Sequence, residues 1–318
     1  MTSSSTEPTV AVVVATHNRP EMLRRCLAAI AAQTRRPDQI IVVDDASQPP
    51  VDADAGDAVG LPGLLVVRSE VAGGPARARN RGWPRARTDY IAFTDDDCRP
   101  SPGWVAALIS AAAPRHLVVG RVRPDPEDGA VSSVLDRSMR VDSDDGRFST
   151  CNVLYPRALL EEMGGFDTGI DMYGEDTDLG QRALEAGATS SFASEALVDH
   201  AVHHLTLRSA VRDRLRLREM PQLVRRHPHL RYATCSGHFV RDSHRSLLFG
   251  MAGLGVLPLG RFGLRSSRRW IDDATHRVPP QLRHGRRLSQ QVAILAALDA
   301  VEVAACARGS MKSRTLLL

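Results

Sequence analysis

From Tyr90 to Asp97 the chain reads YIAFTDDD, an apolar run that ends in three adjacent carboxylates. The apolar run predicts a β-strand that is buried on both faces and ends at about Thr94. Three carboxylates directly after a buried strand are costly to desolvate unless a positive charge lies close to them. A divalent cation that holds a diphosphate would supply this charge, because hard cations prefer oxygen ligands. The stretch therefore predicts a strand with a metal and phosphate site at its end.

A second acidic cluster follows further along the chain, where residues 174–179 read GEDTDL. A carboxylate at this place is a candidate to take a proton from an attacking hydroxyl group. A metal, a diphosphate and a base together describe the transfer of a group from a nucleotide-activated donor.

Strand and helix patterns alternate on the N-terminal side of the first cluster. Strands are expected at residues 10–14, 39–43, 64–68 and 90–94, and helices at 21–33 and 76–83. This alternation predicts a parallel sheet in an α/β domain. Ligands of such sheets bind beyond the carboxyl ends of the strands. The segments 16–19, 44–45 and 95–97 fall at such ends.

The pattern continues to about residue 205 and then changes. A helix is expected at 104–113, a strand at 117–122, a polar loop at 124–147, a helix at 157–163 that ends at Gly164-Gly165, and a helix at 177–186. Arginine-rich helices follow from about 206. We therefore expect a disordered leader at 1–8, an α/β domain at 9–205 and a basic helical extension at 206–318.

The charge of the chain is divided in the same way. Residues 1–205 carry 20 Lys or Arg and 30 Asp or Glu, whereas residues 206–318 carry 21 and 7. The basic extension is expected to face something anionic. Nearly every basic residue is Arg, with Lys312 the single Lys. High Arg together with abundant Ala indicates a GC-rich genome rather than a nucleic-acid-binding role.

Cysteine usage and the N-terminus point to the cytoplasm. The five cysteines are odd in number, dispersed and without a CxxC pair, which fits a reducing compartment and neither a disulfide framework nor a zinc site. The polar first eight residues lack the apolar segment of a signal peptide.

Two apolar stretches of the extension are candidates for membrane contact. Residues 247–259 are too few to cross a bilayer, which takes ~20 residues. Residues 292–307 contain Asp299 and Glu302, which also argues against a span. They are expected to be core or interfacial helices, and the flanking arginines favour an anionic cytoplasmic surface. The protein is therefore expected to be cytoplasmic, with peripheral association at the inner face of the cell membrane as one outcome.

Six motifs in order give the chain its resemblance to a known family. They are VVVATHNR (12–19), VVDDAS (42–47), GPARARNRG (74–82), FTDDD (93–97), GGFD (164–167) and GEDTDL (174–179). In this order they resemble the inverting family 2 glycosyltransferases of GT-A fold, over roughly residues 10–205. The resemblance implies a mostly parallel sheet flanked by helices, with a Rossmann-like nucleotide-binding half. The weaker resemblance beyond 205 is to bacterial members with basic C-terminal extensions.

The resemblance implies a nucleotide-sugar donor site built from several motifs. Its residues are Thr16, Asn18, Arg19, Asp45, Arg79, Asp95 and Asp96. In this assignment Asp45 bonds the base or ribose, and Asp95 and Asp96 face the ribose and the metal. For Arg79, stabilisation of phosphate charge and an exposed helix face both remain open, and Asp45 could instead cap the next segment.

The resemblance also implies a metal ligand and a base. Asp97 would bind Mn2+ or Mg2+ directly, and His200 would contact the metal or the diphosphate. Asp176 would be the base, with a place in a helix N-terminal turn as the alternative role. Two positions depart from the common pattern, since Ala15 stands where many relatives carry proline and Cys98 where an acidic residue is common. The second departure leaves the metal preference open.

The expected function is metal-dependent, inverting transfer of a sugar from a nucleotide-diphosphate sugar to a hydroxyl group. The acceptor would be a glycan, a lipid-linked molecule or a small molecule, as in cell-wall or polysaccharide biosynthesis, and no nucleic acid is involved. One alternative is a sugar-phosphate nucleotidyltransferase, but those enzymes carry a glycine-rich loop where this chain has Thr16 to Pro20. The other is a non-enzymatic adaptor that binds a membrane or nucleic acid through 206–318, which leaves the acidic motifs unexplained.

Overall fold

The computed structural model describes residues 7–52, 54–170, 173–233, 235–255 and 260–318. Residues 1–6 of the expected leader therefore lie outside the described residues. The chain forms two compact units, one of Met1–Asp128 with Ser138–Ala201 and one of Gly129–Arg137 with Val202–Leu318. The second unit thus includes a short segment that the sequence pattern assigns to the first domain.

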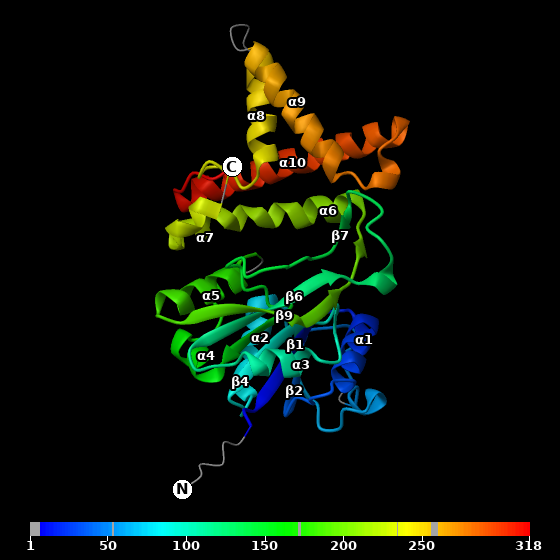
Figure 1. Cartoon of the computed structure of the whole chain (residues 1–318), viewed down its shortest axis with the longest axis vertical. Helices are drawn as coiled ribbons and strands as arrows, with labels where there is room; N and C mark the ends of the chain where they lie inside the picture. Colours follow the sequence, from blue (N-terminus) through cyan, green and yellow to red (C-terminus); the bar gives the residue numbers. More distant parts are fainter. Residues whose placement is uncertain (1–6, 53, 171–172, 234, 256–259) are drawn as a thin grey trace. The chain divides into compact units, whose positions relative to one another are not determined.

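The first unit is built on an eight-stranded mixed sheet (Figure 1) with the order β3-β2-β1-β4-β8-β6-β9-β5. The strands are β1 (Val10–Thr16), β2 (Gln39–Asp45), β3 (Leu65–Ser69), β4 (Tyr90–Asp95), β5 (Cys98–Pro100), β6 (His116–Pro124), β8 (Val153–Pro156) and β9 (Thr189–His200). The four strands β3, β2, β1 and β4 are parallel to one another. β8 runs antiparallel to both β4 and β6, so the sheet is mixed beyond β4.

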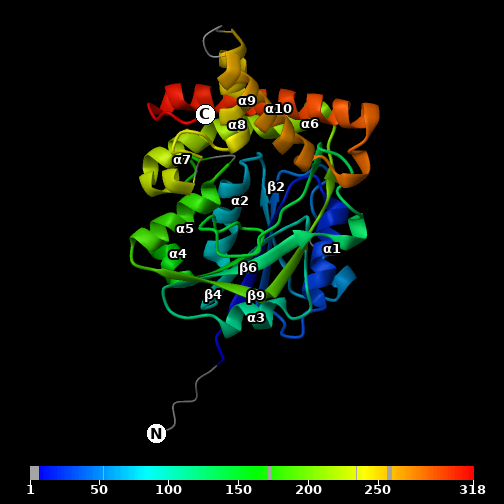
Figure 2. The same ribbon diagram turned by 45° about the horizontal axis from the view of Figure 1, so that its top comes forward.

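Helices cover both faces of this sheet. They are α1 (Pro20–Ala31), α2 (Pro75–Gly82), α3 (Trp104–Ser110), α4 (Arg157–Met163) and α5 (Glu175–Glu185), with 3-10 turns η1 (Asp57–Val59), η2 (Trp83–Arg85) and η3 (Pro126–Asp128). The crossover from β1 to β2 runs one way along the sheet, and the crossover from β3 to β4 runs the other way. Because parallel crossovers are right-handed, α1 and α2 must cover opposite faces, as the turned view shows (Figure 2).

Burial on both faces explains why the first strands are continuous apolar runs. The side chains from Val10 to Val14 are at most 1% exposed, and Val42, Val43, Ile91 and Phe93 are fully buried. α2 lies directly on this sheet, because a Cβ at Gly82 would lie 2.6 Å from Val43 Cγ2 and 2.9 Å from Val13 Cγ1. This close contact fixes the helix that carries Arg79.

The expected strands and helices of the first unit are present with shifts of a few residues at their ends. α4 ends at Gly164, whose φ of 68° is the left-handed conformation of a glycine cap. Three strands were not expected from the sequence. β5 and β8 have only three and four residues, and β9 reads TSSFASEALVDH, without an apolar run, because most of its side chains are partly or fully exposed.

The second unit is helical. Its helices are α6 (Leu207–Arg214), α7 (Met220–Arg226), α8 (Asp242–Gly255), α9 (Gly260–Arg277) and α10 (Gly285–Ser313), with turns η4 (Leu215–Glu219), η5 (Pro228–Ala233) and η7 (Pro280–Leu282). The short strands β7 (Asp136–Arg137) and β10 (His203–His204) pair in an antiparallel bridge. Its core gathers Val134, Trp270, Ala274, Val278 and Leu295. Among the described residues, no helix combines the length and the apolar character that crossing a bilayer requires.

α10 carries two buried carboxylates that are neutralised inside this unit. Asp299 accepts two hydrogen bonds from Arg277, at 3.0 and 2.7 Å, and one from Trp270 Nε1. Glu302 pairs with Arg214 at 2.8 Å, with Arg241 at 3.3 Å and with His244 at 2.8 Å. Three arginines therefore hold the two acids that interrupt the apolar stretch 292–307.

Candidate active site

The three carboxylates after β4 meet the end of β1. Ala15 lies opposite Asp95 in the parallel pair β1–β4, so the turn after β1 and the acidic cluster share one edge of the sheet. Thr16 Oγ1 donates to Asp96 Oδ2 at 2.7 Å. Arg19 Nη1 donates to both Asp96 and Asp97, at 2.9 and 3.0 Å. The structure thus brings together Thr16 and Arg19 with the acidic motif, as expected from the sequence.

At this edge of the sheet the two buried carboxylates of Asp96 and Asp97 share one arginine, Arg19. Asp96 and Asp97 are 3% and 7% exposed, and Arg19 contacts both of them with one nitrogen. Burial raises the pKa of Asp96 to about 6 and the charge of Asp97 acts in the same direction, while Arg19 and Thr16 act against it. A further cation would relieve the repulsion between the two carboxylates.

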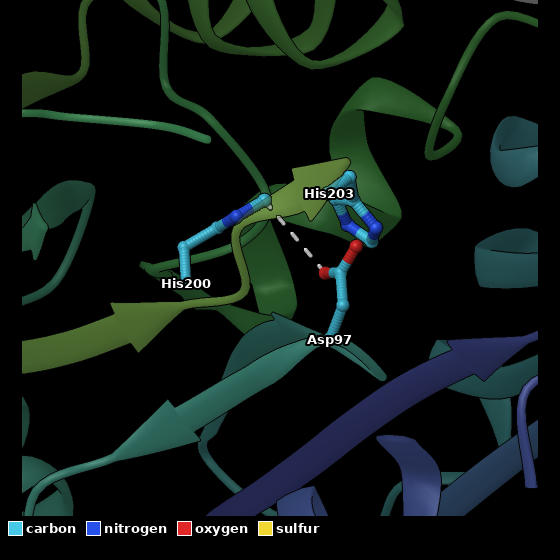
Figure 3. A group of neighbouring side chains, drawn as sticks. All are labelled: Asp97, His200 and His203. Atoms are coloured by element: carbon cyan, nitrogen blue, oxygen red, sulfur yellow. Dashed lines mark ion pairs between the residues drawn. The ribbon is translucent and has the colours of Figure 1, made fainter. Parts of the chain in front are cut away.

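Asp97 also faces His200, as Figure 3 shows. His200 Nε2 lies 3.7 Å from Asp97 Oδ1. His200 Nδ1 lies 2.9 Å from the carbonyl oxygen of Ala201, which only accepts, so Nδ1 carries the proton of the neutral ring. Nε2 then presents a lone pair to a carboxylate oxygen. His203, also drawn in Figure 3, belongs to the second unit.

The donor atoms of this pair fit a divalent metal. Two electron-rich atoms 3.7 Å apart are favourable neighbours when a cation lies between them. A carboxylate oxygen is the ligand that Mg2+ and Mn2+ prefer, and imidazole suits transition metals. The hydrogen bond from Nδ1 to a backbone carbonyl is the usual device that orients a metal-binding histidine. Asp97 and His200 are therefore suited to the metal that the sequence predicts.

Arg79 connects the two acidic motifs. Its guanidinium donates to Asp95 Oδ1 at 2.8 Å and to Glu175 Oε1 at 2.9 Å. It also lies over the ring of Phe166, 5.7 Å from the ring centroid. Arg79 is only 5% exposed, so the exposed helix face that the sequence left open is excluded. One buried cation thus holds the end of β4, the GGFD turn and the first residue of α5 together.

Asp176 lies half-buried in the first turn of α5, beside Glu175. Burial and the negative charge of Glu175 raise its pKa to about 7, while the N–H of Thr177 and the charge of Arg79 act in the opposite direction. The Thr177 N–H donates to Asp176 Oδ1 at 2.7 Å. A carboxylate with this pKa exchanges protons near neutral pH, as a general base requires.

The other expected donor residues shape the edge through the backbone. The Asp45 carboxylate accepts the N–H groups of Gly73 and Gly74, each at 2.9 Å, and so holds the loop that opens α2. Asn18, with a φ of 56°, receives the Gln48 N–H at 2.7 Å on its side-chain oxygen. Asp45 therefore holds the loop before α2 through its carboxylate, and its contact with the nucleotide stays a prediction.

Sequence reasoning missed Asn80 and Glu175 as parts of the site. Asn80 forms two hydrogen bonds with the backbone of Phe166, at 2.7 and 2.9 Å. A Cβ at Gly165 would lie 2.5 Å from Asn80 Oδ1, so only glycine leaves room for this clamp. The signal was present, since Asn80 lies in the same motif as Arg79, but its partner lies 86 residues away.

A cavity of about 270 Å³ opens beside Arg19. Thr16, Arg19 and Ser47 contribute polar groups to it, and the remaining surface is mostly apolar. The apolar part comes from α1 and from the loop after β2, through Leu23, Leu27, Pro50 and Val51. The cavity therefore offers an apolar surface next to the turn that contacts the acidic cluster.

The chain is similar in sequence and in structure to proteins named as glycosyltransferases. The model of the family described as glycosyl transferase family 2 matches residues 11–163. The pre-mycofactocin glycosyltransferase of Mycobacterium tuberculosis is 33% identical over 207 residues, which cover 60% of this chain and 42% of that protein. The matched region thus spans less than half of that relative's length. Glycosyltransferase AglE of Haloferax volcanii is 26% identical, with 62% and 68% covered.

A third relative and two solved structures complete the comparison. The N-acetylglucosaminyl-diphospho-decaprenol L-rhamnosyltransferase of M. tuberculosis is 26% identical, over 61% of this chain and 76% of that protein. The mannosyltransferase PcManGT of Pyrobaculum calidifontis, solved with GDP-Man and Mn2+, has a TM-score of 0.55 at 19% identity, with 98% and 88% covered. GalNAc-T7, solved with UDP, GalNAc and Mn2+, has a TM-score of 0.50 at 18% identity, with 64% and 45% covered. The likeness in structure shows that the first unit has the GT-A fold.

Proposed function

We propose that the protein transfers a sugar from a nucleotide-diphosphate sugar to an acceptor hydroxyl group, on the premise that residues 11–163 match the model of glycosyl transferase family 2. The transfer inverts the anomeric configuration and depends on Mn2+ or Mg2+. The observation that supports this most is the position of Arg79, which bonds both Asp95 and Glu175. The metal motif and the base motif therefore lie on either side of one side chain, close enough to act on one substrate.

In the proposed reaction Asp176 removes the proton of the acceptor hydroxyl. The hydroxyl oxygen then forms a bond to the anomeric carbon from the face opposite the diphosphate, and the bond from that carbon to the diphosphate oxygen breaks. Asp97 and His200 hold the metal, which, when bound, neutralises the charge of the leaving diphosphate. No covalent enzyme intermediate forms, so one displacement inverts the configuration.

The donor is assigned to the edge formed by the turns after β1, β2 and β4. Thr16, Asn18, Arg19 and Asp45 hold the nucleotide there, and the cavity beside Arg19 supplies apolar surface. Asp95 and Asp96 face the ribose and the metal. Since Arg79 already bonds two carboxylates, we assign it to holding the site rather than to the phosphates.

The acceptor class is proposed from the relatives. One is named for a decaprenol-linked sugar and another for pre-mycofactocin, so a lipid-linked acceptor, a glycan and a small molecule are all compatible with the family. Synthesis of cell-wall or other polysaccharides at the cytoplasmic side of the membrane would use such acceptors.

Thermal-shift screening of nucleotide-sugars with and without Mn2+ tests the donor. The cognate donor should raise the melting temperature only with the metal, because a ligand that binds the folded state stabilises it by mass action. Incubation of the cognate donor with candidate acceptors should then release a nucleoside diphosphate. Release of pyrophosphate from a nucleoside triphosphate and a sugar phosphate would instead identify a nucleotidyltransferase and overturn the proposal.

A further inference from the structure

The second unit exposes an apolar and basic surface on the helices α8 and α9. These helices pack side by side (Figure 1), and small residues form their contact. A Cβ at Gly250 would lie 2.7 Å from Ser267 Oγ and 3.3 Å from Ser267 N. Ser266 is also buried. Several larger side chains near this contact are exposed to solvent, whereas Trp270 of α9 is buried.

Three of these exposed side chains are large and apolar. Phe249 is 40% exposed, Met251 64% and Leu264 53%. They lie on the last turns of α8 and the first turns of α9. The core of the unit contains Trp270 of α9, and Leu247 of α8 packs against this core. The three exposed side chains are therefore not part of the described core of the unit and lie in solvent.

The charge of the same region is entirely positive. Residues 246–271 contain four arginines and no acid, and the next acids are Asp272 and Asp273. Arg265, Arg268 and Arg269 are exposed on α9 next to Leu264. Elsewhere in the unit the arginines Arg214, Arg241 and Arg277 are held by buried carboxylates, so they add little to the field outside. Exposed basic and exposed apolar side chains thus occur together on this pair of helices.

We propose that this surface, made of Phe249, Met251, Leu264, Arg265, Arg268 and Arg269, docks the protein on an anionic lipid bilayer. The guanidinium groups match the phosphates of the headgroups. The apolar side chains match the boundary between headgroups and acyl chains, where interfacial helices bury their apolar faces. Single-stranded nucleic acid would need aromatic side chains for stacking, and the exposed side chains here are mainly aliphatic. The proposal goes beyond sugar transfer and does not depend on it.

The contribution of the arginines is tested by co-sedimentation of the full chain with two kinds of vesicle. One contains phosphatidylcholine alone, and the other contains phosphatidylcholine mixed with phosphatidylglycerol. Co-sedimentation should occur with the mixed vesicles and weaken with salt. Each basic residue near an anionic surface contributes about fivefold to the partition coefficient, so Arg265→Gln with Arg268→Gln should lower it ~25-fold. Arg286→Gln with Arg287→Gln is the matched control, since both residues are exposed on α10, and should change it far less. Equal binding of the wild type to both vesicles, or equal loss in both variants, would overturn the proposal.

The contribution of the apolar side chains is tested with the double variant that carries Met251→Gln and Leu264→Gln. This variant should lose the binding that remains at high salt, whereas Met311→Gln with Leu316→Gln, which alters side chains 76% and 56% exposed, should retain it. Circular dichroism and donor-induced thermal shifts should be unchanged in every variant. Light scattering without vesicles completes the test. A stable dimer that Met251→Gln and Leu264→Gln dissociate, with no vesicle binding by the wild type, would assign the surface to a second copy of this chain.

Discussion

The carboxylate of Asp97 is held between groups of different character, because Arg19 bonds one of its oxygens and His200 faces the other. The arginine supplies part of the charge that the cluster needs, and it does so from a side chain that is 40% exposed. An exposed guanidinium can leave the carboxylates when a metal and a diphosphate arrive. We therefore expect Asp97 to be held in place before the metal binds and to be freed as a ligand afterwards.

Asp97→Asn should weaken Mn2+ binding by at least tenfold and abolish most of the activity, because a neutral amide is a poor ligand for a hard cation. Isothermal titration with Mn2+ measures the first effect and donor turnover the second. Asp199→Asn is the control, since that carboxylate lies next to His200 but pairs with Arg123. Full activity of the wild type in excess EDTA would show that the reaction needs no metal.

As the proposed base, Asp176 should give the reaction a dependence on pH. Its pKa is raised to about 7, so the carboxylate is protonated below this value and kcat should fall as the pH drops through 7. Asp176→Asn cannot accept a proton, and its kcat should be lower by ~10²–10⁴-fold, with donor affinity little changed. Normal turnover at saturating donor, with weakened donor binding, would place Asp176 in the donor site instead.

Arg79 should set that pH dependence. Removing a cation near a carboxylate favours the neutral form, so Arg79→Gln should move the acidic limb of the kcat profile up by about one unit or more. Glu175→Gln removes a negative charge beside Asp176 and should move the limb down. The double variant should lie between the two. If all three variants lost activity without any shift of the profile, Arg79 would serve the fold only.

At the scale of the elements, α10 depends on its buried ion pairs. Burial acts to raise the pKa of Glu302, but His244, Arg241 and Arg214 outweigh it and hold the pKa below its usual range. The carboxylate therefore stabilises the fold at neutral pH, and this contribution is lost as the pH falls through the lowered pKa.

Glu302→Gln leaves two arginines without their charge partner and should cost about 3–5 kcal/mol of unfolding free energy, the usual effect of breaking a buried pair. Urea unfolding followed by circular dichroism measures the loss. Asp273→Asn breaks a pair on α9 whose carboxylate is 46% exposed, and should cost about 0.3–0.5 kcal/mol. Equal small losses in both variants would show that the network adds nothing to stability.

The strands also differ in how well the sequence predicts them. β1, β2 and β4 were predictable because both of their faces are buried, which forces continuous apolar runs. β9 was not, since its pairing with β6 shifts register after Gly120 and most of its side chains are partly or fully exposed. In the site, the position of Asp95, Asp96 and Asp97 was predictable because they stand at the end of β4. The bond between Arg79 and Glu175 does not, because tertiary packing alone brings residues 96 positions apart together.

The whole molecule reproduces the division of charge along the chain in two compact units. The sequence placed the boundary near residue 205, from the change to arginine-rich helices. It could not assign the polar segment 129–137, because contacts distant in sequence hold that segment among the C-terminal helices. They are the burial of Val134 and the ion pair between Arg137 and Asp213.

Because of this segment the chain passes between the two units three times, at residues 128–129, 137–138 and 201–202. One proteolytic cut or one stop codon therefore cannot separate the first unit from the second. A chain shortened at residue 205 keeps Val134 but loses Trp270 and Leu295, so it should aggregate in size-exclusion chromatography. Replacing residues 129–137 of the shortened chain by a glycine-serine linker should restore a monomer. The first unit can therefore be produced alone only when residues 129–137 are replaced together with the removal of the C-terminal helices.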